Sequence, residues 1–419
     1  MVDTKPDEAD DVVRFRQWFR QNGGFLHPSI YFLRGESGFS VMTTEFLPAD
    51  TTVVSCPFSL AITQNVARDA LDHLLSPEAA SNWTERQLIC SYLCMHEATG
   101  LSSAALRHQP YLDILPSYTS LRTSVYFTEH ELELFKGTNL YGATQDRKNE
   151  LISEYHICVD TVRKTSEEWA SRFTCDNYVA SATYLSSRAF PSTLMSAQPS
   201  LMVTPTSYPV LFPGLDALNH ARAQPVTWKV SDDYACTDGA INRSDGASIS
   251  LMLHSPTNAS EELFNNYGPK PNSELILGYG FSLQNNPDDT IVLKIAGMER
   301  RWEIGRDARG MEDLWIEFRK SFGSESDTSA DPEDIITDDL DAIDTLSTMV
   351  ADLLDRIPTV MDHSRSEESV VRPDVAQMRE HYIEGQTSII DAILQFMDEK
   401  KQSCIERAQR DGVNIVFEG

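Results

Sequence analysis

The sequence predicts an α+β fold, in which a mainly antiparallel sheet domain is split by a helical insertion and followed by a helical C-terminal region. Three observations predict this fold. Strand-like segments separated by glycine and proline turns follow a first helical pattern within residues 12–81 and return over residues 190–290. Between them, residues 82–189 carry apolar side chains at helical spacing, and residues 291–419 end in a long helical pattern. Strands and helices that come in separate runs, rather than in regular alternation, are typical of α+β proteins.

The first part of the sheet domain, residues 12–81, begins with a helical pattern from Val12 to Gln21, which the glycines of "NGG" end. The stretch "IYFLRGESGFSVMTT" then predicts two short strands around a turn from Gly35 to Gly38. A further strand, in "TTVVSCPFSLAI", is expected to end at Pro57.

The insertion, residues 82–189, reads as a series of helices. In "WTERQLICSYLCMHEATG" the apolar residues recur at spacings of three and four, which places Cys90 and Cys94 on one helix face as small core residues. Thr128 and Glu131 form a predicted capping box at the start of "TEHELELF". Two more helices are expected in "NELISEYHICVDTVRKTSEEW" and "NYVASATYLSSRAF".

The last two parts of the chain differ in character. Up to about residue 290, turn residues punctuate strand candidates, among them "SISLMLHS" and "SELILGYGF". Within the C-terminal part, Ser321 to Asp355 contains eleven acids and no Lys or Arg, which predicts an acidic loop grading into an acidic helix. A long helix is expected after Pro373, in "DVAQMREHYIEGQTSIIDAILQFMDEKKQSCIERAQ".

Composition limits the class of protein and its compartment. The 419 residues suggest two or three folded regions, and 41% hydrophobic residues supply a real core. No apolar run is long enough for a transmembrane helix, and the acidic N-terminus lacks the pattern of a signal peptide. Seven dispersed cysteines suit a reducing compartment. We therefore expect no membrane contact and a cytoplasmic or nuclear protein.

Charge limits the partners. The net charge of -28 argues against nucleic acid, because phosphate binding requires a basic surface. The same charge is compatible with a basic protein partner, although charge for solubility is an equally good explanation. No pair of cysteines has metal-ligand spacing, and no second histidine follows His96 at the spacing of a zinc site, so no metal is expected.

The segment "VLFPGLDALNHARAQP" carries polar residues that need an explanation. Pro213 and Pro225 bound it, so it forms a short turn rather than a long helix. Asp216, Asn219 and His220 lie among leucines and need partners if they are buried. Backbone groups or a ligand could both serve, and the segment alone leaves this open.

A second segment, "FNNYGPKPNSELILGYGFSLQNNPDD", repeats Tyr-Gly at Tyr267 and Tyr279. By itself it predicts a hairpin with tyrosines in a half-buried sheet. Together with the Asn-His pair about fifty residues earlier, it resembles the SET-domain methyltransferases, in the branch typified by the Rubisco large-subunit lysine methyltransferase. "WFRQNGG", "GESGFSVMTTEFLPADTTVVSCP", "YLSSRAF" and "MREHYIEGQTSIIDAIL" fall in the order expected of that branch, from about Val12 to Phe396.

The resemblance implies a SET fold with a knot-like core, a helical insertion and a C-terminal domain that binds substrate. It implies S-adenosylmethionine as cofactor and a lysine of a protein as methyl acceptor. Tyr267 would orient the lysine amine, with Asp216 and Tyr279 beside it. The implied cofactor contacts are Ser37, Gly38, Phe39, Arg188, Asn219, His220, Tyr279 and Phe281.

The chemistry fits these residue types. Methyl transfer needs a neutral amine aimed at the methyl group, and positioning supplies much of the rate. Lysine is normally protonated, with a pKa near ~10.4, and an aromatic channel next to a sulfonium disfavours its charged form. The phenol of Tyr267 can hydrogen-bond the amine without adding charge. Whether Tyr267 also accepts the proton of the lysine stays open, because the amine could equally lose its proton to water before the site closes.

Two alternatives stay open. The first turn of this family usually reads Glu-Gly-x-Gly, whereas Ser37 and Ser40 stand at the Glu and at the second Gly. These changes, with the acidic insertion, favour a SET-fold binding protein that has lost or repurposed the activity. The family also has a protein-histidine methyltransferase branch, in which the second Tyr-Gly-Phe tyrosine is replaced. Tyr279 is present here, which favours lysine.

Overall fold

The structure is a computed structural model, and it describes residues 8–35, 38–100, 103–231, 246–322, 331–358 and 371–415. The chain forms two compact units. The first contains residues 1–121 and 147–269, and the second contains residues 122–146 and 270–419. The expected boundary after residue 290 therefore lies inside the second unit, which also takes part of the expected insertion. Within the described ranges, none of the helices has the length and apolar character needed to cross a bilayer.

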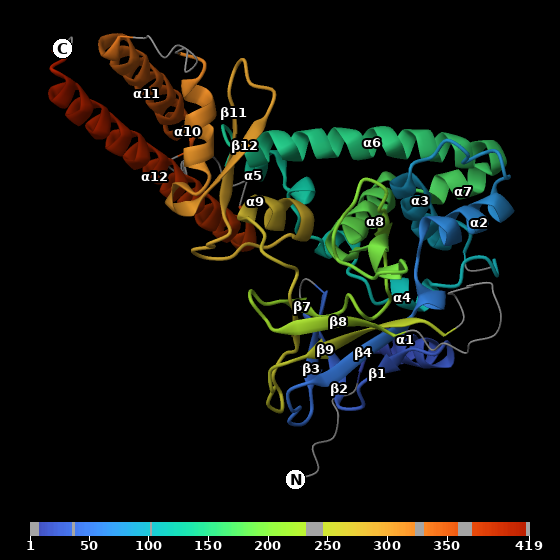
Figure 1. Cartoon of the computed structure of the whole chain (residues 1–419). Coiled ribbons are helices and arrows are strands. Elements are labelled where there is room, and N and C mark those ends of the chain that lie inside the picture. Colours follow the sequence, from blue (N-terminus) through green and yellow to red (C-terminus); the bar gives the residue numbers. More distant parts are fainter. Residues whose placement is uncertain are drawn as a thin grey trace. The chain divides into compact units, whose positions relative to one another are not determined.

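The sheet of the first unit is antiparallel, as the sequence predicts. Its strands run in the order β1 (Phe25–Leu26), β4 (Thr51–Pro57), β9 (Ser248–Leu253) and β8 (Val226–Ser231), and Figure 1 shows the last three side by side. The predicted hairpin is β2 (Ile30–Gly35) paired with β3 (Gly38–Thr43), with Gly35 opposite Gly38. The first helix, α1 (Asp10–Gln21), ends where expected, with Asn22 as its C-cap.

Two short strand pairs complete the sheet part of this unit. β5 (Phe190–Pro191) pairs with β6 (Pro209–Val210) in the antiparallel sense. β7 (Asn219–His220) pairs in parallel with β10 (Phe264–Asn265), so the Asn-His segment lies directly beside the chain that leads to Tyr267. The segment from Pro213 to Asp216 is a turn, which confirms the prediction from its flanking prolines.

Helices form the rest of the first unit, and they bury the apolar faces predicted for the insertion. They are α2 (Gln64–Leu74), α3 (Glu85–Ala98), α4 (Gln109–Leu112), α7 (Glu167–Arg172) and α8 (Cys175–Arg188), with the 3-10 turns Phe58–Leu60, Tyr118–Ser120 and Ser192–Met195. Cys90 and Cys94 are both buried core residues on α3, as expected. The helix α6 (Asn139–Thr165) begins in the second unit and continues in the first.

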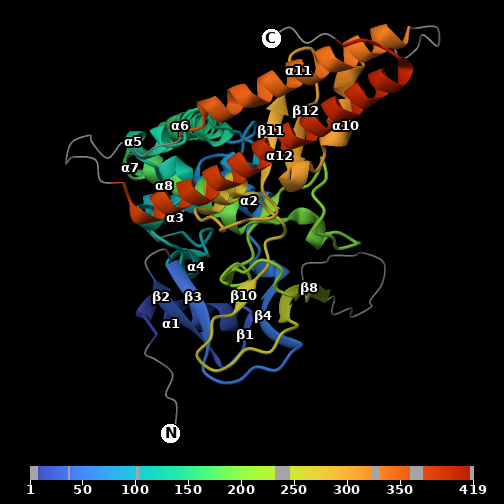
Figure 2. The ribbon, with the colours of Figure 1, turned by 90° about the vertical axis from the view of Figure 1, so that its left-hand side faces the viewer.

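The second unit is mostly helical around one hairpin. β11 (Thr290–Lys294) pairs with β12 (Arg301–Gly305). The helical elements are α5 (Glu129–Glu133), α9 (Asn272–Glu274), α10 (Met311–Arg319), α11 (Pro332–Arg356) and α12 (Pro373–Asp411), with 3-10 turns at Ser124–Tyr126 and Arg306–Ala308. Figure 2 shows α11 running along α12, and the two share a buried apolar core. The capping box of Thr128 and Glu131 is present at the start of α5.

The acidic segment 321–355 is mainly helix rather than loop. Residues 323–330 lie outside the described residues, but Asp331 caps α11, which then runs to Arg356. The apolar residues of α11 lie on one face of the helix, between its acidic residues. This apolar face packs into the core and holds the helix in place; its buried residues are Ile336, Ala342, Ile343, Leu346 and Val350. The expected loop is therefore wrong for residues 332–355, whereas the acidic helix into which it was expected to grade is present.

The expected strand in "SELILGYGF" is also wrong. Residues 272–274 form α9, and Leu275–Tyr279 continue as a π-helical turn that ends at Gly280 with a left-handed φ of 83°. Pro271 precedes the first turn, where its missing N–H costs nothing. The apolar run from Leu275 to Leu277 lacks the alternation of a half-buried strand, so a helical turn can bury it equally well.

Candidate functional site

Tyr267 and His220 form the centre of the candidate site in the first unit. The rings of the two residues stack with centroids 5.0 Å apart. The backbone N–H of Tyr267 donates to Nδ1 of His220 over 3.0 Å, and the Tyr267 hydroxyl donates to the carbonyl of Leu218 over 2.9 Å. In this geometry Nδ1 of His220 acts as a hydrogen-bond acceptor. The parallel pairing of β7 with β10 fixes this arrangement.

Asn219 links this centre to the glycine hairpin. Its Nδ2 donates to Glu262 Oε1 over 2.8 Å and lies 3.4 Å from both the carbonyl of Phe39 and Oγ of Ser40. Strand β3 therefore lies beside the Asn-His segment, as the resemblance implies for the cofactor turn. Ser37 lies outside the described residues.

The turn itself needs a glycine at one position. Gly38 has a φ of 132°, which L-residues rarely adopt, and an added Cβ would meet the ring of Pro116 at 3.6 Å. Phe39 follows, with the Arg34 guanidinium 4.5 Å above its ring. Next to Gly38 lies a cavity of about 430 Å³, whose walls include Gly35, Pro116, Ser181 and Tyr184.

Arg188 and Asp216 meet at the other end of the Asn-His segment. Arg188 is the last residue of α8, and its NH1 donates to the backbone carbonyl of Asp216 over 3.0 Å and lies 3.4 Å from Oδ2. The Asp216 carboxylate is buried and also accepts a hydrogen bond of 2.6 Å from the hydroxyl of Tyr111, on α4. Burial raises the pKa of Asp216, and Arg188 and Tyr111 oppose that shift.

Tyr111 is a residue that the sequence interpretation missed. It is fully buried, and in the sequence it looks like any other aromatic core residue of a helical region. Its hydroxyl acquires a role only because the fold brings α4 to Asp216. Sequence spacing carried no signal for this contact.

Tyr279 and Phe281 belong to the second unit. Their rings lie 6.2 Å apart in an edge-on arrangement, and Lys270 Nζ lies 5.4 Å from the centre of the Tyr279 ring. Gly280 between them permits a close approach, since an added Cβ would stand 2.7 Å from backbone atoms of Arg122 and Thr123. Burial raises the pKa of Tyr279, so its hydroxyl is neutral at physiological pH.

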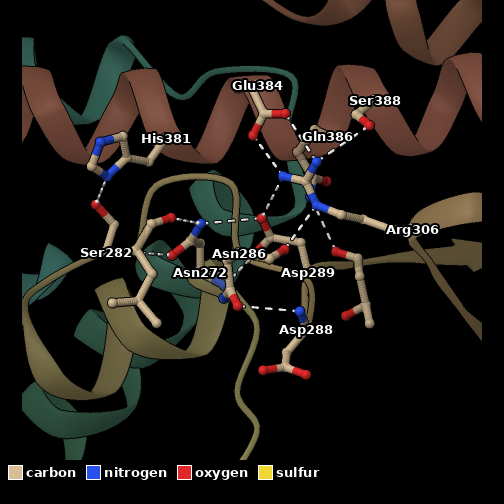
Figure 3. Close-up of polar contacts among 12 residues, drawn as sticks. Asn272, Ser282, Asn286, Asp288, Asp289, Arg306, His381, Glu384, Gln386 and Ser388 are labelled. Atoms are coloured by element: carbon tan, nitrogen blue, oxygen red, sulfur yellow. Dashed lines mark hydrogen bonds and ion pairs between the residues drawn. The ribbon is translucent and has the colours of Figure 1, made fainter. Parts of the chain in front are cut away.

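The loop that carries this pair is closed by one amide side chain, drawn in Figure 3. Asn272 is fully buried; its Nδ2 donates to the Leu283 carbonyl over 2.9 Å and its Oδ1 accepts from the Leu283 N–H over 2.8 Å. The Asp289 carboxylate in turn accepts two hydrogen bonds from Asn272, one from its backbone N–H over 2.7 Å and one from Nδ2 over 3.1 Å. Burial raises the pKa of Asp289 to about 6, while Asn272 and Arg306 act against the shift.

Arg306 connects Asn272 and Asp289, which hold the ends of this loop, to α12. Its guanidinium donates to both carboxylate oxygens of Glu384, over 2.9 and 2.5 Å, and lies 3.4 Å from Asp289 Oδ2. Figure 3 shows a second link along the same helix, where Ser282 Oγ lies 2.9 Å from His381 Nδ1. The turn with Tyr279 and Phe281 is thus fixed by the long C-terminal helix of its own unit.

The structure therefore brings most of the predicted residues together within the first unit. Gly38, Phe39, Arg188, Asp216, Asn219, His220 and Tyr267 all surround the β7–β10 pair or its flanking turns. Tyr279 and Phe281 are held separately, in the second unit. Across the described ranges, no group of three or more His, Cys, Asp or Glu side chains is arranged to hold a metal ion.

The chain is similar to known lysine methyltransferases in sequence. The ribosomal lysine N-methyltransferase set10 of Schizosaccharomyces pombe is 34% identical over 283 residues, which cover 66% of this chain and 46% of that protein. The N-lysine methyltransferase SETD6 of Mus musculus is 25% identical over 295 residues, covering 68% of this chain and 57% of that protein. The chain spans about half the length of these curated relatives. No protein-family model matches it.

The fold is similar over nearly the whole chain to a solved structure. The SET domain of LSMT bound to lysine and AdoHcy has a TM-score of 0.72 and 16% sequence identity, with 96% of this chain and 94% of that chain covered. A second solved structure, of Rubisco LSMT bound to AdoMet, has a TM-score of 0.69 and 16% sequence identity, with 98% of this chain and 98% of that chain covered. This likeness confirms the predicted fold, a SET domain with a helical insertion and a helical C-terminal region.

Proposed function

We propose that the chain is a SET-domain lysine methyltransferase of the branch of the Rubisco large-subunit enzyme, and that it transfers methyl groups from S-adenosylmethionine to a lysine of a protein; its sequence likeness to lysine methyltransferases and its fold support this. One observation carries the proposal: Tyr267 stacks on His220 and donates to the Leu218 carbonyl, so the phenol that would meet the amine is fixed beside the Asn-His segment. Tyr267 and the Asn-His segment are among the residues by which the chain resembles that family.

The residues around this centre fit an S-adenosylmethionine molecule. Gly38, Phe39, Asn219 and His220 would contact it, with Arg188 holding a charged or polar end. Within the described part of the chain, the hydrogen bonds of Arg188 all leave from NH1, and its side chain is 23% exposed, so other donors of the guanidinium are available to a ligand. The bound cofactor supplies an electrophilic methyl group on a sulfonium. Ser37 is proposed as a contact on resemblance alone.

The chain's own side chains would prepare the lysine. The Tyr267 hydroxyl orients the amine nitrogen, and Asp216 lies near the same channel. On the resemblance alone, Tyr279 and Phe281 are proposed as aromatic walls that exclude water and so favour the neutral amine. Tyr279 adds no charge, because burial raises its pKa. Positioning then provides much of the rate.

The acceptor is proposed to be a basic protein other than a histone, met in the cytoplasm or nucleus. The net charge of -28 supports this, because an acidic surface attracts lysine-rich partners and speeds their association. A ribosomal protein would have this chemistry, and the set10 relative is named as a ribosomal lysine methyltransferase. Nucleic acid, membranes and metal ions have no part in the proposal.

Titration calorimetry with S-adenosylmethionine and S-adenosylhomocysteine tests the cofactor, and labelled-methyl transfer into cell extract tests the reaction. We expect micromolar binding by the wild type. Tyr267→Phe should keep that binding and lose at least about ten-fold in transfer, since it removes the group that orients the amine. Tyr208→Phe is a matched control, because Tyr208 is also half-buried and in the first unit. Full transfer by Tyr267→Phe to every substrate would exclude the assigned role, and no cofactor binding at millimolar concentration would favour the binding-protein alternative.

A further inference from the structure

The Asp216 carboxylate is in an unusual position, because it is a buried charge held more closely by a tyrosine than by its arginine. Its side chain is 2% exposed. The Tyr111 hydroxyl donates to Oδ2 over 2.6 Å, whereas Arg188 NH1 stands 3.4 Å from the same oxygen. The best hydrogen bond of Arg188, at 3.0 Å, goes to the backbone carbonyl of Asp216 instead.

This geometry sets Tyr111 and Arg188 in competition for one carboxylate. A buried carboxylate needs hydrogen-bond partners, since an unpaired one is costly. Opposite charges attract strongly in a poorly polarisable interior. With the tyrosine hydroxyl in place, the carboxylate is satisfied and the guanidinium stays at the backbone carbonyl. Without it, the arginine is the remaining partner, and we expect its guanidinium to move onto Oδ2.

Such a movement matters because Arg188 is a proposed cofactor contact. Within the described residues, its Nε and NH2 make no hydrogen bond that would hold them away from a ligand. A guanidinium drawn onto Asp216 would turn these donors inward. Burial raises the pKa of Tyr111, and Asp216 raises it further, so the phenol keeps its proton and remains a donor near neutral pH.

We propose that Tyr111 is a positioning residue for cofactor binding: its hydroxyl satisfies Asp216 and thereby keeps the Arg188 guanidinium directed at S-adenosylmethionine. The inference rests on the proposed function and assigns a role in it to the helical insertion. It concerns a residue that touches neither cofactor nor substrate. Its effect is therefore expected in cofactor affinity rather than in the transfer step.

The test is calorimetric titration of S-adenosylmethionine into the full chain and three variants. Tyr111→Phe should weaken binding about ten-fold, the effect of losing a hydrogen bond to a charged group. Tyr92→Phe is the matched control, because Tyr92 is equally buried in the same insertion and its hydroxyl contacts His108 rather than Asp216. It should lose stability but keep the wild-type affinity within about two-fold.

A rescue separates positioning from a general loss of structure. In Tyr111→Phe combined with Asp216→Asn, the charge that draws Arg188 away is removed, and affinity should return to within about three-fold of the wild type. Circular dichroism establishes that each variant is folded, and the double variant tests the idea even where the single one is unstable.

The outcomes are distinct. Equal affinity of the wild type and Tyr111→Phe, or a double variant as weak as the single one, overturns this inference and leaves the proposed function standing. A wild type that does not bind S-adenosylmethionine overturns both.

Discussion

Replacing Gly385 by alanine tests the contact between α12 and the base of the Tyr279 turn. Gly385 lies inside a 39-residue helix, so helix propensity alone predicts that Gly385→Ala stabilises the protein, by about 1 kcal/mol. The structure predicts the opposite sign. An added Cβ would overlap Oδ2 of Asp289 and stand 2.9 Å from its Cγ, where roughly 3.5 Å is the comfortable separation.

The magnitude follows from what Asp289 holds. The carboxylate is 1% exposed and accepts from Asn272 N and Nδ2, so a shift that relieves the overlap weakens hydrogen bonds to a buried charge. Overpacking typically costs about 1–3 kcal/mol, and each such hydrogen bond is worth about 1.5–3 kcal/mol. After the propensity gain is subtracted, we expect a net loss of about 2 kcal/mol.

Urea unfolding, followed by circular dichroism and by tryptophan fluorescence, measures this loss. Gly142→Ala is the matched control, because Gly142 also lies in a helix of the second unit but an added Cβ there meets nothing within 4 Å. It should stabilise the protein by up to about 1 kcal/mol. A Gly385→Ala protein as stable as the wild type would refute the reasoning, since the overlap would then be relieved at no cost.

Two further predictions concern buried side chains that can carry a charge. Burial lowers the pKa of His96 to about 4 and that of His108 to about 3, so the unfolded chain binds these protons more readily and stability falls as the pH drops below about 6.5. Between pH 6.5 and 5 each histidine should lower the free energy of unfolding by about 2 kcal/mol. Urea midpoints measured over this pH range check this. In His96→Gln, the slope of the unfolding free energy against pH should correspond to one proton fewer. Asp339→Asn should cost roughly 2 kcal/mol in urea unfolding, because the buried Asp339 pairs with two arginines that are about one-third exposed. Asp344→Asn, which loses only a surface pair with a lysine, should cost less than about 0.5 kcal/mol, and similar losses for the two would contradict the assignment.

Local sequence signals predicted the elements whose causes are local. The helix α1 ends at Gln21 because Asn22 and two glycines follow it, and α5 begins after Thr128 because a capping box satisfies its first N–H groups. The turn from Pro213 to Asp216 follows from its prolines. In each case the residues that decide the conformation lie within a few positions of one another, so they can be read without the fold.

Two predictions failed where local signals were balanced. The apolar run after Pro271 suits a strand or a helical turn, and packing of the buried Leu275 and Ile276 decides for the turn. The acidic residues around Asp339 resemble a solvated loop, yet the stripe of apolar residues between them packs against α12. Burial, which depends on distant segments, decided both.

The sequence by itself determined the fold class, the order of most helices and strands, and the Asn-His and Tyr-Gly segments as candidates for the site, because turn chemistry, periodicity and the spacing of these segments are properties of neighbouring positions. Only the tertiary structure decided that Tyr111 contacts Asp216 and that Asn219 contacts β3. It also decided that the loop with Tyr279 is held by Asn272 and Asp289 within the second unit, whereas Tyr267 lies in the first. Tyr111 and Asp216 are 105 positions apart. Contacts at such separations arise from the way in which helices and sheets bury their apolar faces, and no local pattern encodes them.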